Sequence, residues 1–216
     1  MSLVYSMARE GYVLEKVRGG RKETELMRFR HRIFREELRW LPESQDGSDR
    51  DDYDPISDNY AVSVHNQVVG SVRLTLGRHD FMLEHEFLAL LPQGWTLHKG
   101  EDSAEITRFA VGQGADGRRS EVAAQLLYFN LYQWSQAQQV RWMYFVVEPS
   151  FFRHILRMGF PAFAIGPARA LDGGVISQAG YLDWSQATPA FIHWLRSGSV
   201  TPVVVQERLH GSDYLH

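Results

Sequence analysis

The sequence predicts an α/β protein in which a single mixed sheet carries helices on both faces. Two observations favour this fold class. An early helical segment precedes three strand-like segments, and helices then alternate with strands toward the end of the chain. In addition, no linker, repeat or low-complexity tract divides the 216 residues, so we expect one domain over residues 1–216.

The first half of the chain alternates polar and apolar residues with recognisable periods. Amphipathic spacing predicts a helix over residues 22–39, and turn-forming residues predict a polar loop over 41–58. Residues 60–64 and 68–76 alternate as two strands, and 81–91 is expected to be a short helix.

The second half repeats a strand and helix order. The predicted segments are a strand at 105–111, a helix at 118–137, a strand at 141–147, a helix at 149–159, strands at 160–165 and 175–182, and a helix at 188–196. A glycine-rich turn at 112–117 precedes the second helix. Such a turn can offer N–H groups to a phosphate, but most of them only connect two elements.

Composition excludes several classes of function. The net charge of −3 gives no global support for nucleic-acid binding. The chain has no cysteine, which excludes disulfides, thiolate catalysis and cysteine metal sites. No apolar run of 18 residues or signal-peptide core is present, so we expect a soluble, cytoplasmic protein without membrane association.

One arginine lies on the apolar side of the first helix. Arg28, Arg32, Arg35 and Arg39 fall on the face opposite the apolar residues and are expected to face solvent. Arg30 falls within the apolar arc, where a permanently charged guanidinium requires partners. Glu37 is one candidate partner. Two interpretations stay open, a structural ion pair and a group that holds an anionic ligand.

Charged residues also occur within predicted strands. Arg73 lies on the polar face of its strand, and regular pleating places Glu105, Thr107 and Phe109 on one face of the 105–111 strand with Arg108 on the other. Charges in a covered sheet are costly unless they are paired or used. A structural network and a functional site would both give this pattern.

The sequence gives little support for a metal site or a covalent nucleophile. Asp51, Asp52 and Asp54 surround Tyr53, but the segment lacks the spacing of an EF-hand loop. The histidines form no His-x-x-x-His pair, and no Gly-x-Ser-x-Gly motif is present. We therefore expect no metal and no covalent enzyme intermediate.

An ordered series of short motifs resembles the LuxI-type acyl-homoserine-lactone synthases of bacterial quorum sensing. The series over residues 22–165 comprises Arg30, Phe34, Trp40, Asp51, Asp54, the GSVRL segment around Arg73, Phe87, and the EITRF segment with Glu105, Thr107 and Arg108. Each motif is weak alone, whereas the ordered set is specific. The resemblance implies a GNAT-like acyltransferase sandwich whose sheet has a V-shaped split.

The resemblance also implies an activity. The enzymes of this family transfer an acyl group from acyl carrier protein, or in some members from coenzyme A, to the amine of S-adenosylmethionine. Lactonisation then expels methylthioadenosine, and no further cofactor is implied. Arginines suit the carboxylate of that substrate, whereas acids and aromatic rings suit its sulfonium. The series listed above would bind S-adenosylmethionine, with Glu105 as the general base that acts through a water.

By position, further residues would serve the acyl donor. The thioester and pantetheine would lie at Phe109, Ala110 and Val111. Candidates for the acyl pocket are Trp142, Phe145, Val147, Phe151, Phe152 and Leu156, most of which could equally be ordinary core. Candidates for carrier-protein contact are Arg118, Arg119, Arg153 and Arg157, although each one singly could equally be a solvated surface residue.

Three departures from the family pattern leave the acyl specificity open. Ala104 stands where tryptophan is common, LTLGRHDFML replaces the usual run after the arginine strand, and neither Thr nor Ser occurs near Val146 and Val147. Acylation of another amine, such as an amino acid, is the alternative activity. A catalytically inactive ligand-binding protein of the same fold is a third hypothesis, against which the intact Glu105 and arginines argue.

Overall fold

A mixed sheet forms the centre of the molecule. The computed structural model describes residues 4–113, 119–171, 174–197 and 201–205. In these residues the strand order is β10-β1-β2-β3-β4-β5-β6-β9-β7, and β8 pairs with β9. The strands are β1 Val4–Arg9, β2 Tyr12–Val17, β3 Asp58–Val64, β4 Gln67–Leu76, β5 Ser103–Val111, β6 Trp142–Val147, β7 Ala162–Ala164, β8 Arg169–Ala170, β9 Ile176–Asp183 and β10 Thr201–Val205.

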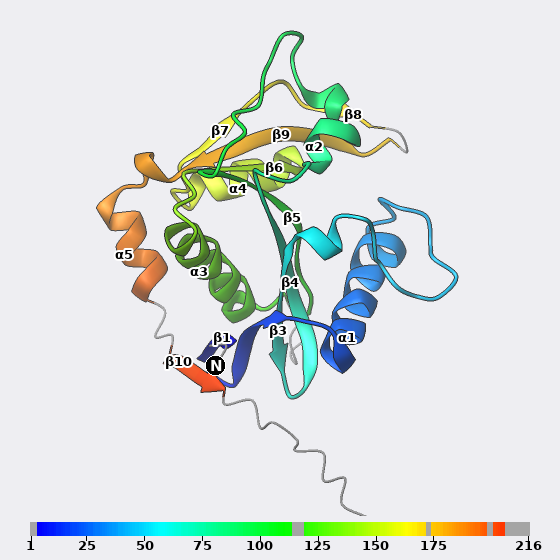
Figure 1. The fold of residues 1–216 in the computed structure, drawn as a ribbon, viewed down its shortest axis with the longest axis vertical. Coiled ribbons are helices and arrows are strands. Elements are labelled where there is room, and N and C mark those ends of the chain that lie inside the picture. Colours follow the sequence, from blue (N-terminus) through cyan, green and yellow to red (C-terminus); the bar gives the residue numbers. More distant parts are fainter. Residues whose placement is uncertain (1–3, 114–118, 172–173, 198–200, 206–216) are drawn as a thin grey trace, which may run out of the picture.

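Helices cover both faces of this sheet, which confirms the predicted fold class. They are α1 Gly20–His31, α2 Met82–His85, α3 Glu121–Ala137, α4 Pro149–Arg157 and α5 Pro189–Ser197, with short π or 3₁₀ turns at η1 Arg32–Glu37, η2 Asp54–Ile56, η3 Leu88–Leu90 and η4 Trp184–Gln186. Figure 1 shows α1 and α3 on opposite sides of β3, β4 and β5. None of the helices in the described ranges is long and apolar enough to cross a bilayer.

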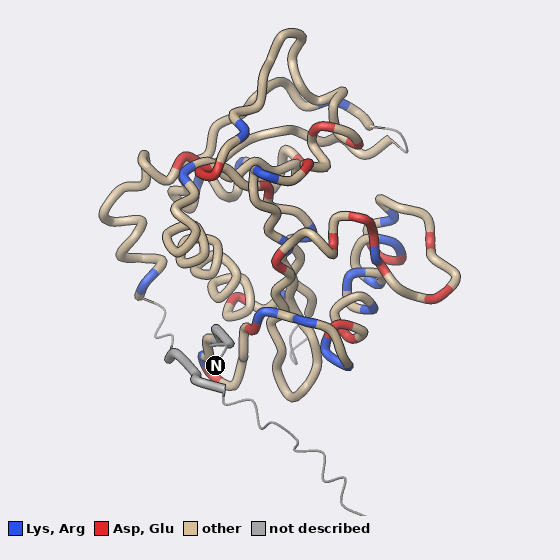
Figure 2. The backbone as a smooth tube through the Cα atoms, in the orientation of Figure 1, with Lys and Arg blue, Asp and Glu red and all other residues tan. Residues whose placement is uncertain are grey.

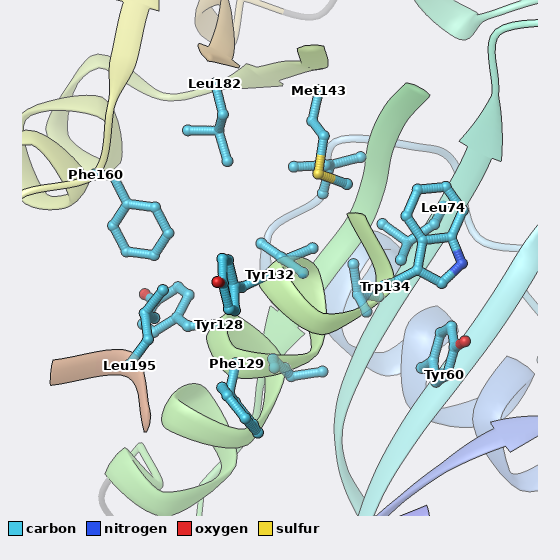
Figure 3. Close-up of a cluster of buried hydrophobic side chains, with 14 of the residues drawn as sticks. Tyr60, Leu74, Tyr128, Phe129, Tyr132, Trp134, Met143, Phe160, Leu182 and Leu195 are labelled. Carbon is cyan, nitrogen blue, oxygen red and sulfur yellow. The ribbon is translucent and has the colours of Figure 1, made fainter. Parts of the chain in front are cut away.

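The alternation of the strands divides the core between the two faces. Tyr60 and Leu74 belong to the cluster around α3, in which Tyr132 and Trp134 also lie (Figure 3). Ala61, one residue along from Tyr60, belongs to the cluster around α1 with Phe29. Successive residues of a strand point to opposite faces of the sheet. The strand neighbours of Arg73 and Glu105 pack in the α3-side core, so Arg73 and Glu105 themselves lie on the α1 side.

The sheet opens between β5 and β6. These two strands are parallel and pair from Ser103↔Trp142 to Ile106↔Phe145, where their register ends. Strand β5 continues to Val111, where it is still paired with β4 on its other side. The diverging edges are the V-shaped split that the resemblance implies.

Several parts of the fold, among them the short strand β8, were not predicted from the sequence. The N-terminal hairpin β1–β2 and strand β10 extend the sheet beyond β3. In β2, Glu15 and Lys16 interrupt the apolar alternation, and only Leu14 and Val17 are buried. The helix predicted over 22–39 also begins earlier and changes to a π turn at Arg32.

Candidate functional site

Arg30 is completely buried between α1 and the loop that follows it. We call residues 41–57, which include η2, the acid loop. Arg30 Nε donates to Asp49 Oδ2 at 3.0 Å, Nη1 donates to Asp54 Oδ1 at 2.6 Å, and Nη2 donates to Asp54 Oδ2 at 3.4 Å. Figure 2 shows acidic residues of the acid loop beside the basic residues of α1. With all three nitrogens paired inside the protein, Arg30 has the contacts of a structural residue.

Glu37 does not pair with Arg30. Its side chain is 57% exposed and lies near Arg32 Nε at 3.7 Å. The π turn of η1 changes the phase of the helix, since Leu38 N donates to Ile33 O, five residues back, at 2.9 Å. The same change brings Arg35, predicted to face solvent, to within 2.8 Å of Asp49 Oδ1.

Asp49 is the centre of the ionic cluster, and the sequence analysis missed it. Its side chain is fully buried, and it accepts from Arg30, Arg35 and Arg108. Burial alone would raise the pKa of the Asp49 carboxyl, but the Arg108 and Arg30 guanidinium groups outweigh burial and hold that pKa well below its ordinary value. In the sequence, Asp49 looks like any other turn aspartate, because its partners are distant along the chain.

A β-bulge directs Arg108 toward the acid loop, against the prediction from regular pleating. Ser71 pairs with Ala110 and Arg73 with Thr107, so two residues of β5 stand opposite Val72 alone. Arg108 has a positive φ of 52°. As a result Phe109 packs on the α3 side, stacked on Tyr128, and Arg108 reaches Asp49 at 2.6 Å.

Arg73 joins the acid loop to the sheet. Its Nε donates to Thr107 Oγ1 at 2.8 Å, and its Nη1 contacts both Asp51 and Asp54. The remaining nitrogen, Nη2, faces Met82 Sδ at 3.0 Å, and Arg108 Nη1 faces the same sulfur at 3.9 Å. A thioether is a weak acceptor, so two buried guanidinium groups direct donors at a point where an anion would bind better.

The cluster contains more positive than negative charge. In the described part of the chain, four guanidinium groups contact three aspartates within it: Arg30, Arg35, Arg73 and Arg108 with Asp49, Asp51 and Asp54. The arginines are therefore not neutralised by these acids alone. A buried excess of positive charge is costly and is relieved by an additional anion.

Glu105 lies on the same face and is 1% exposed. Its two oxygens accept from the backbone N–H groups of Met82 and Leu83, each at 2.8 Å. Burial raises the pKa of the Glu105 carboxyl from 4.5 to about 7, although both N–H groups and the Arg73 cation oppose the rise. A carboxyl with such a pKa can exchange protons near neutral pH.

Aromatic rings connect the cluster to an open groove. Arg108 lies over the Phe34 ring at 5.5 Å, and Phe34 contacts Trp40 with ring centroids 5.9 Å apart. Trp40 lines a groove of about 500 Å³. Its other lining residues are Leu38, Glu148, Pro149, Ser150, Arg153, Gly174, Val175 and Ile176. Phe87 instead packs in a separate cluster around Phe81 and Tyr144.

The residues predicted for the acyl donor separate into two groups. Phe145, Val147, Phe151 and Phe152 lie in or against the α3-side core, where Phe151 contacts Phe109 at 5.9 Å and Phe145 contacts Phe152 at 5.8 Å. Trp142 packs instead against His98, with ring centroids 4.1 Å apart, and Leu156 is 44% exposed. The structure therefore does not bring Trp142 and Leu156 together with the other four.

Residues Phe109, Ala110 and Val111 lie on the part of β5 beyond its pairing with β6. Of the four arginines predicted to meet a carrier protein, Arg153 and Arg157 are exposed one turn apart on α4, and Arg153 also lines the groove. Arg119 is exposed before α3, and Arg118 lies outside the described residues.

The sequence matches a family of known proteins. The family described as autoinducer synthase matches residues 15–190. An acyl-homoserine-lactone synthase of Rhizobium radiobacter is 29% identical over 73% of this chain and 76% of its own length. A second, from Aeromonas salmonicida, is also 29% identical over 73% of this chain and covers 78% of its own length.

Solved structures share the fold. The synthase LasI superposes with a TM-score of 0.74 at 19% identity, covering 94% of this chain and 98% of its own. BjaI, a CoA-dependent synthase solved with S-adenosylmethionine and isopentyl-CoA, gives 0.67 at 18% identity over 90% of this chain and 88% of its own. FeeM, an N-acyl amino acid synthase, gives 0.59 at 16% identity over 82% and 93%.

Proposed function

The chain belongs to the autoinducer synthase family, and from this premise we propose that it is an acyl-homoserine-lactone synthase that acylates S-adenosylmethionine. One observation of the structure supports the proposal most: a buried cluster with excess positive charge lies beside a carboxyl of raised pKa and is connected by aromatic rings to a groove. A small substrate with an anionic group, an amine and a bulky cationic portion fits this arrangement.

The amino-acid end of S-adenosylmethionine would bind in the cluster. Arg73 and Arg108 direct nitrogens at Met82 Sδ, and the substrate carboxylate would replace this weak acceptor. Arg30 is already paired with Asp49 and Asp54, so we assign it to holding the acid loop rather than to contact with substrate. Thr107 positions the Arg73 side chain.

The rest of that substrate would extend past the aromatic rings. Phe34 and Trp40 offer faces to the sulfonium, and Asp51, 22% exposed, is the least buried of the three clustered acids. The adenosyl group would enter the groove lined by Trp40, Pro149 and Val175. Phe87 lies in a different cluster, so its role would be to support α2.

Glu105 would act as the general base through a water. It takes a proton from the substrate ammonium, and the amine then attacks the thioester carbonyl. A C–N bond forms, the C–S bond of the thioester breaks, and the thiol of the carrier leaves with a proton. The substrate carboxylate oxygen then attacks the carbon bonded to the sulfonium, which closes the lactone and releases neutral methylthioadenosine.

The acyl donor would enter through the split between β5 and β6. Phe109, Ala110 and Val111 border this split, and Phe145, Val147, Phe151 and Phe152 would contact the acyl chain. Arg153 and Arg157 on α4 and Arg119 before α3 would contact an acyl carrier protein or the phosphates of coenzyme A. S-adenosylmethionine and both kinds of acyl donor occur inside the cell, so we expect the reaction to take place in the cytoplasm, where it would supply a quorum-sensing signal.

The test is to incubate the protein with S-adenosylmethionine and a panel of acyl-carrier-protein and acyl-CoA thioesters. We expect methylthioadenosine and free thiol in equal amounts. Glu105→Gln is the matched control, because it keeps the shape of the side chain and removes the base. Absence of methylthioadenosine with every donor would contradict the proposal.

An N-acyltransferase that uses another amine is the second candidate. Its support is the fold shared with FeeM and the absence of Thr or Ser near Val146 and Val147. In the same assay, with amino acids added in turn, this activity would release thiol without methylthioadenosine.

A further inference from the structure

Helix α2 donates two hydrogen bonds to the Glu105 carboxylate. The backbone N–H groups of Met82 and Leu83 each donate to one oxygen at 2.8 Å. The position of this four-residue helix therefore determines how well the carboxylate is solvated by the protein. The contacts that hold α2 in place therefore also affect the proposed base, Glu105.

The sides of α2 are held by residues of other segments. Phe81, just before the helix, and Leu83 are fully buried in the cluster with Tyr144. Lys99, from the segment before β5, contacts Glu84 Oε2 at 2.6 Å. On the side of the acid loop, Tyr53 Oη donates at 2.7 Å to Oε2 of Glu86, the residue that follows α2.

Tyr53 also contacts the arginine cluster. The Arg73 guanidinium lies over the Tyr53 ring at 5.5 Å, and Tyr53 N donates to Asp51 Oδ1 at 3.0 Å. Burial and the Glu86 carboxylate both raise the pKa of the Tyr53 hydroxyl, so it stays protonated and donates at neutral pH. A single residue of the acid loop thus contacts Asp51, Arg73 and the end of α2.

We propose that Tyr53 and Glu86 are positioning residues, whose hydrogen bond fixes α2 so that its N–H groups hold the Glu105 carboxylate. Through this bond, the position of the acid loop, where the substrate amino acid would bind, would also determine the position of α2 and of the N–H groups that hold the base. This inference rests on the proposed function for its meaning in catalysis. Its geometric core, the dependence of Glu105 on the Tyr53–Glu86 bond, does not require that function.

The test follows the ionisation of Glu105 directly. Infrared difference spectra against Glu105→Gln isolate the carboxyl band of Glu105, and its titration gives a midpoint in the full-length protein without substrate. The other charged groups around Glu105, namely Arg73 and Lys99, are unchanged in every variant used. Circular dichroism confirms that each variant is folded.

Three substitutions separate the hydrogen bond from other effects. Tyr53→Phe keeps the ring over Arg73, and Glu86→Ala removes the acceptor. For both we expect the midpoint to rise by about 0.5 to 1 pH unit, the equivalent of partly weakening one hydrogen bond to a carboxylate. Glu86→Gln retains an acceptor oxygen for Tyr53 and should keep the wild-type midpoint. Glu10→Gln, which removes an exposed ion-pair carboxylate between β1 and β2, is a control at a distant site and should also keep it.

The double variant Tyr53→Phe/Glu86→Ala should shift the midpoint no further than either single variant. Equal midpoints in wild type, Tyr53→Phe and Glu86→Ala would overturn the inference, as would shifts that add in the double variant. A failure of the methylthioadenosine assay would leave this titration unaffected. In active protein at pH 7, we also expect kcat to fall about 2- to 5-fold in Tyr53→Phe, because that shift lowers the ionised fraction of Glu105 by this factor, with KM for S-adenosylmethionine unchanged.

Discussion

Arg108 reaches Asp49 across 59 residues of sequence, with its Nε 2.6 Å from the carboxylate Oδ2. The contact depends on a positive φ of 52° at Arg108, which costs backbone energy in any residue other than glycine. The bulge turns Arg108 away from the α3-side core and into the acid loop. The ion pair therefore holds the acid loop against β5, the strand that borders the split in the sheet.

Loss of the Asp49 charge should destabilise the fold strongly. In Asp49→Asn three guanidinium groups lose their shared anion, which for a buried pair costs about 3 to 5 kcal/mol. Urea unfolding measures this change. The exposed neighbour Asp52→Asn is the control and should stay within about 0.5 kcal/mol of wild type. Equal stability of both variants would show that Asp49 is dispensable.

Arg108→Lys should weaken the binding of S-adenosylmethionine while the fold survives. A lysine keeps the charge but cannot contact Asp49 and Asp51 while it directs a second nitrogen toward Met82. We expect KM for S-adenosylmethionine to rise about tenfold, the equivalent of one lost charge-assisted hydrogen bond. Arg32→Lys, on the exposed side of η1, is the matched control. An unchanged KM in Arg108→Lys would remove Arg108 from the substrate site.

Stability should depend on pH through Glu105. Its folded pKa of about 7 is above the ordinary 4.5, so the native state binds the proton more tightly than the unfolded chain. The stabilisation is complete below pH 4.5 and is lost as pH rises through 7. Between pH 5 and 8 wild type should lose roughly 2 to 3 kcal/mol relative to Glu105→Gln. Parallel stability curves for the two proteins would contradict this account of the carboxyl.

Phe151→Ala should change the preference for acyl chains. The ring is half-buried, contacts Phe109 at 5.9 Å, and lies beside the split, so its removal leaves room for longer chains. We expect kcat/KM with a donor two carbons longer to rise at least about threefold relative to the best wild-type donor, since each buried methylene contributes about 0.8 kcal/mol. Phe163→Ala, which removes a 42% exposed ring on β7, should leave the preference unchanged. If Phe151→Ala and Phe163→Ala had the same chain-length preference, the acyl chain would not lie beside Phe151.

Local sequence patterns were enough to predict most helices and strands and several of the buried charged residues. The apolar arc of the first helix placed Arg30 among apolar residues, and alternation placed Arg73 on the polar face of its strand. These inferences depend on neighbours three or four residues away, or on the two-residue period of a strand. The resemblance of the ordered motifs then identified the family, which spacing alone did not.

The remaining features depend on contacts between distant segments. Asp49 has no sequence signal because its charge partners lie on α1, η1 and β5. A bulge at Arg108 and a π turn at η1 each insert one residue into a regular pattern, which periodicity treats as continuous. For this reason periodicity offers Glu37 as a candidate partner of Arg30 and predicts that Arg35 faces solvent.

The central claim is that this protein joins an acyl chain to the methionine portion of S-adenosylmethionine and closes a lactone. The most direct measurement is mass spectrometry of the product made from an octanoyl thioester and S-adenosylmethionine with ¹³C in its methionyl carbons. We predict an N-octanoyl-homoserine lactone that carries the label, formed by wild type and not by Glu105→Gln. A labelled open-chain amide, or an unlabelled acyl product at the same yield, would contradict the claim.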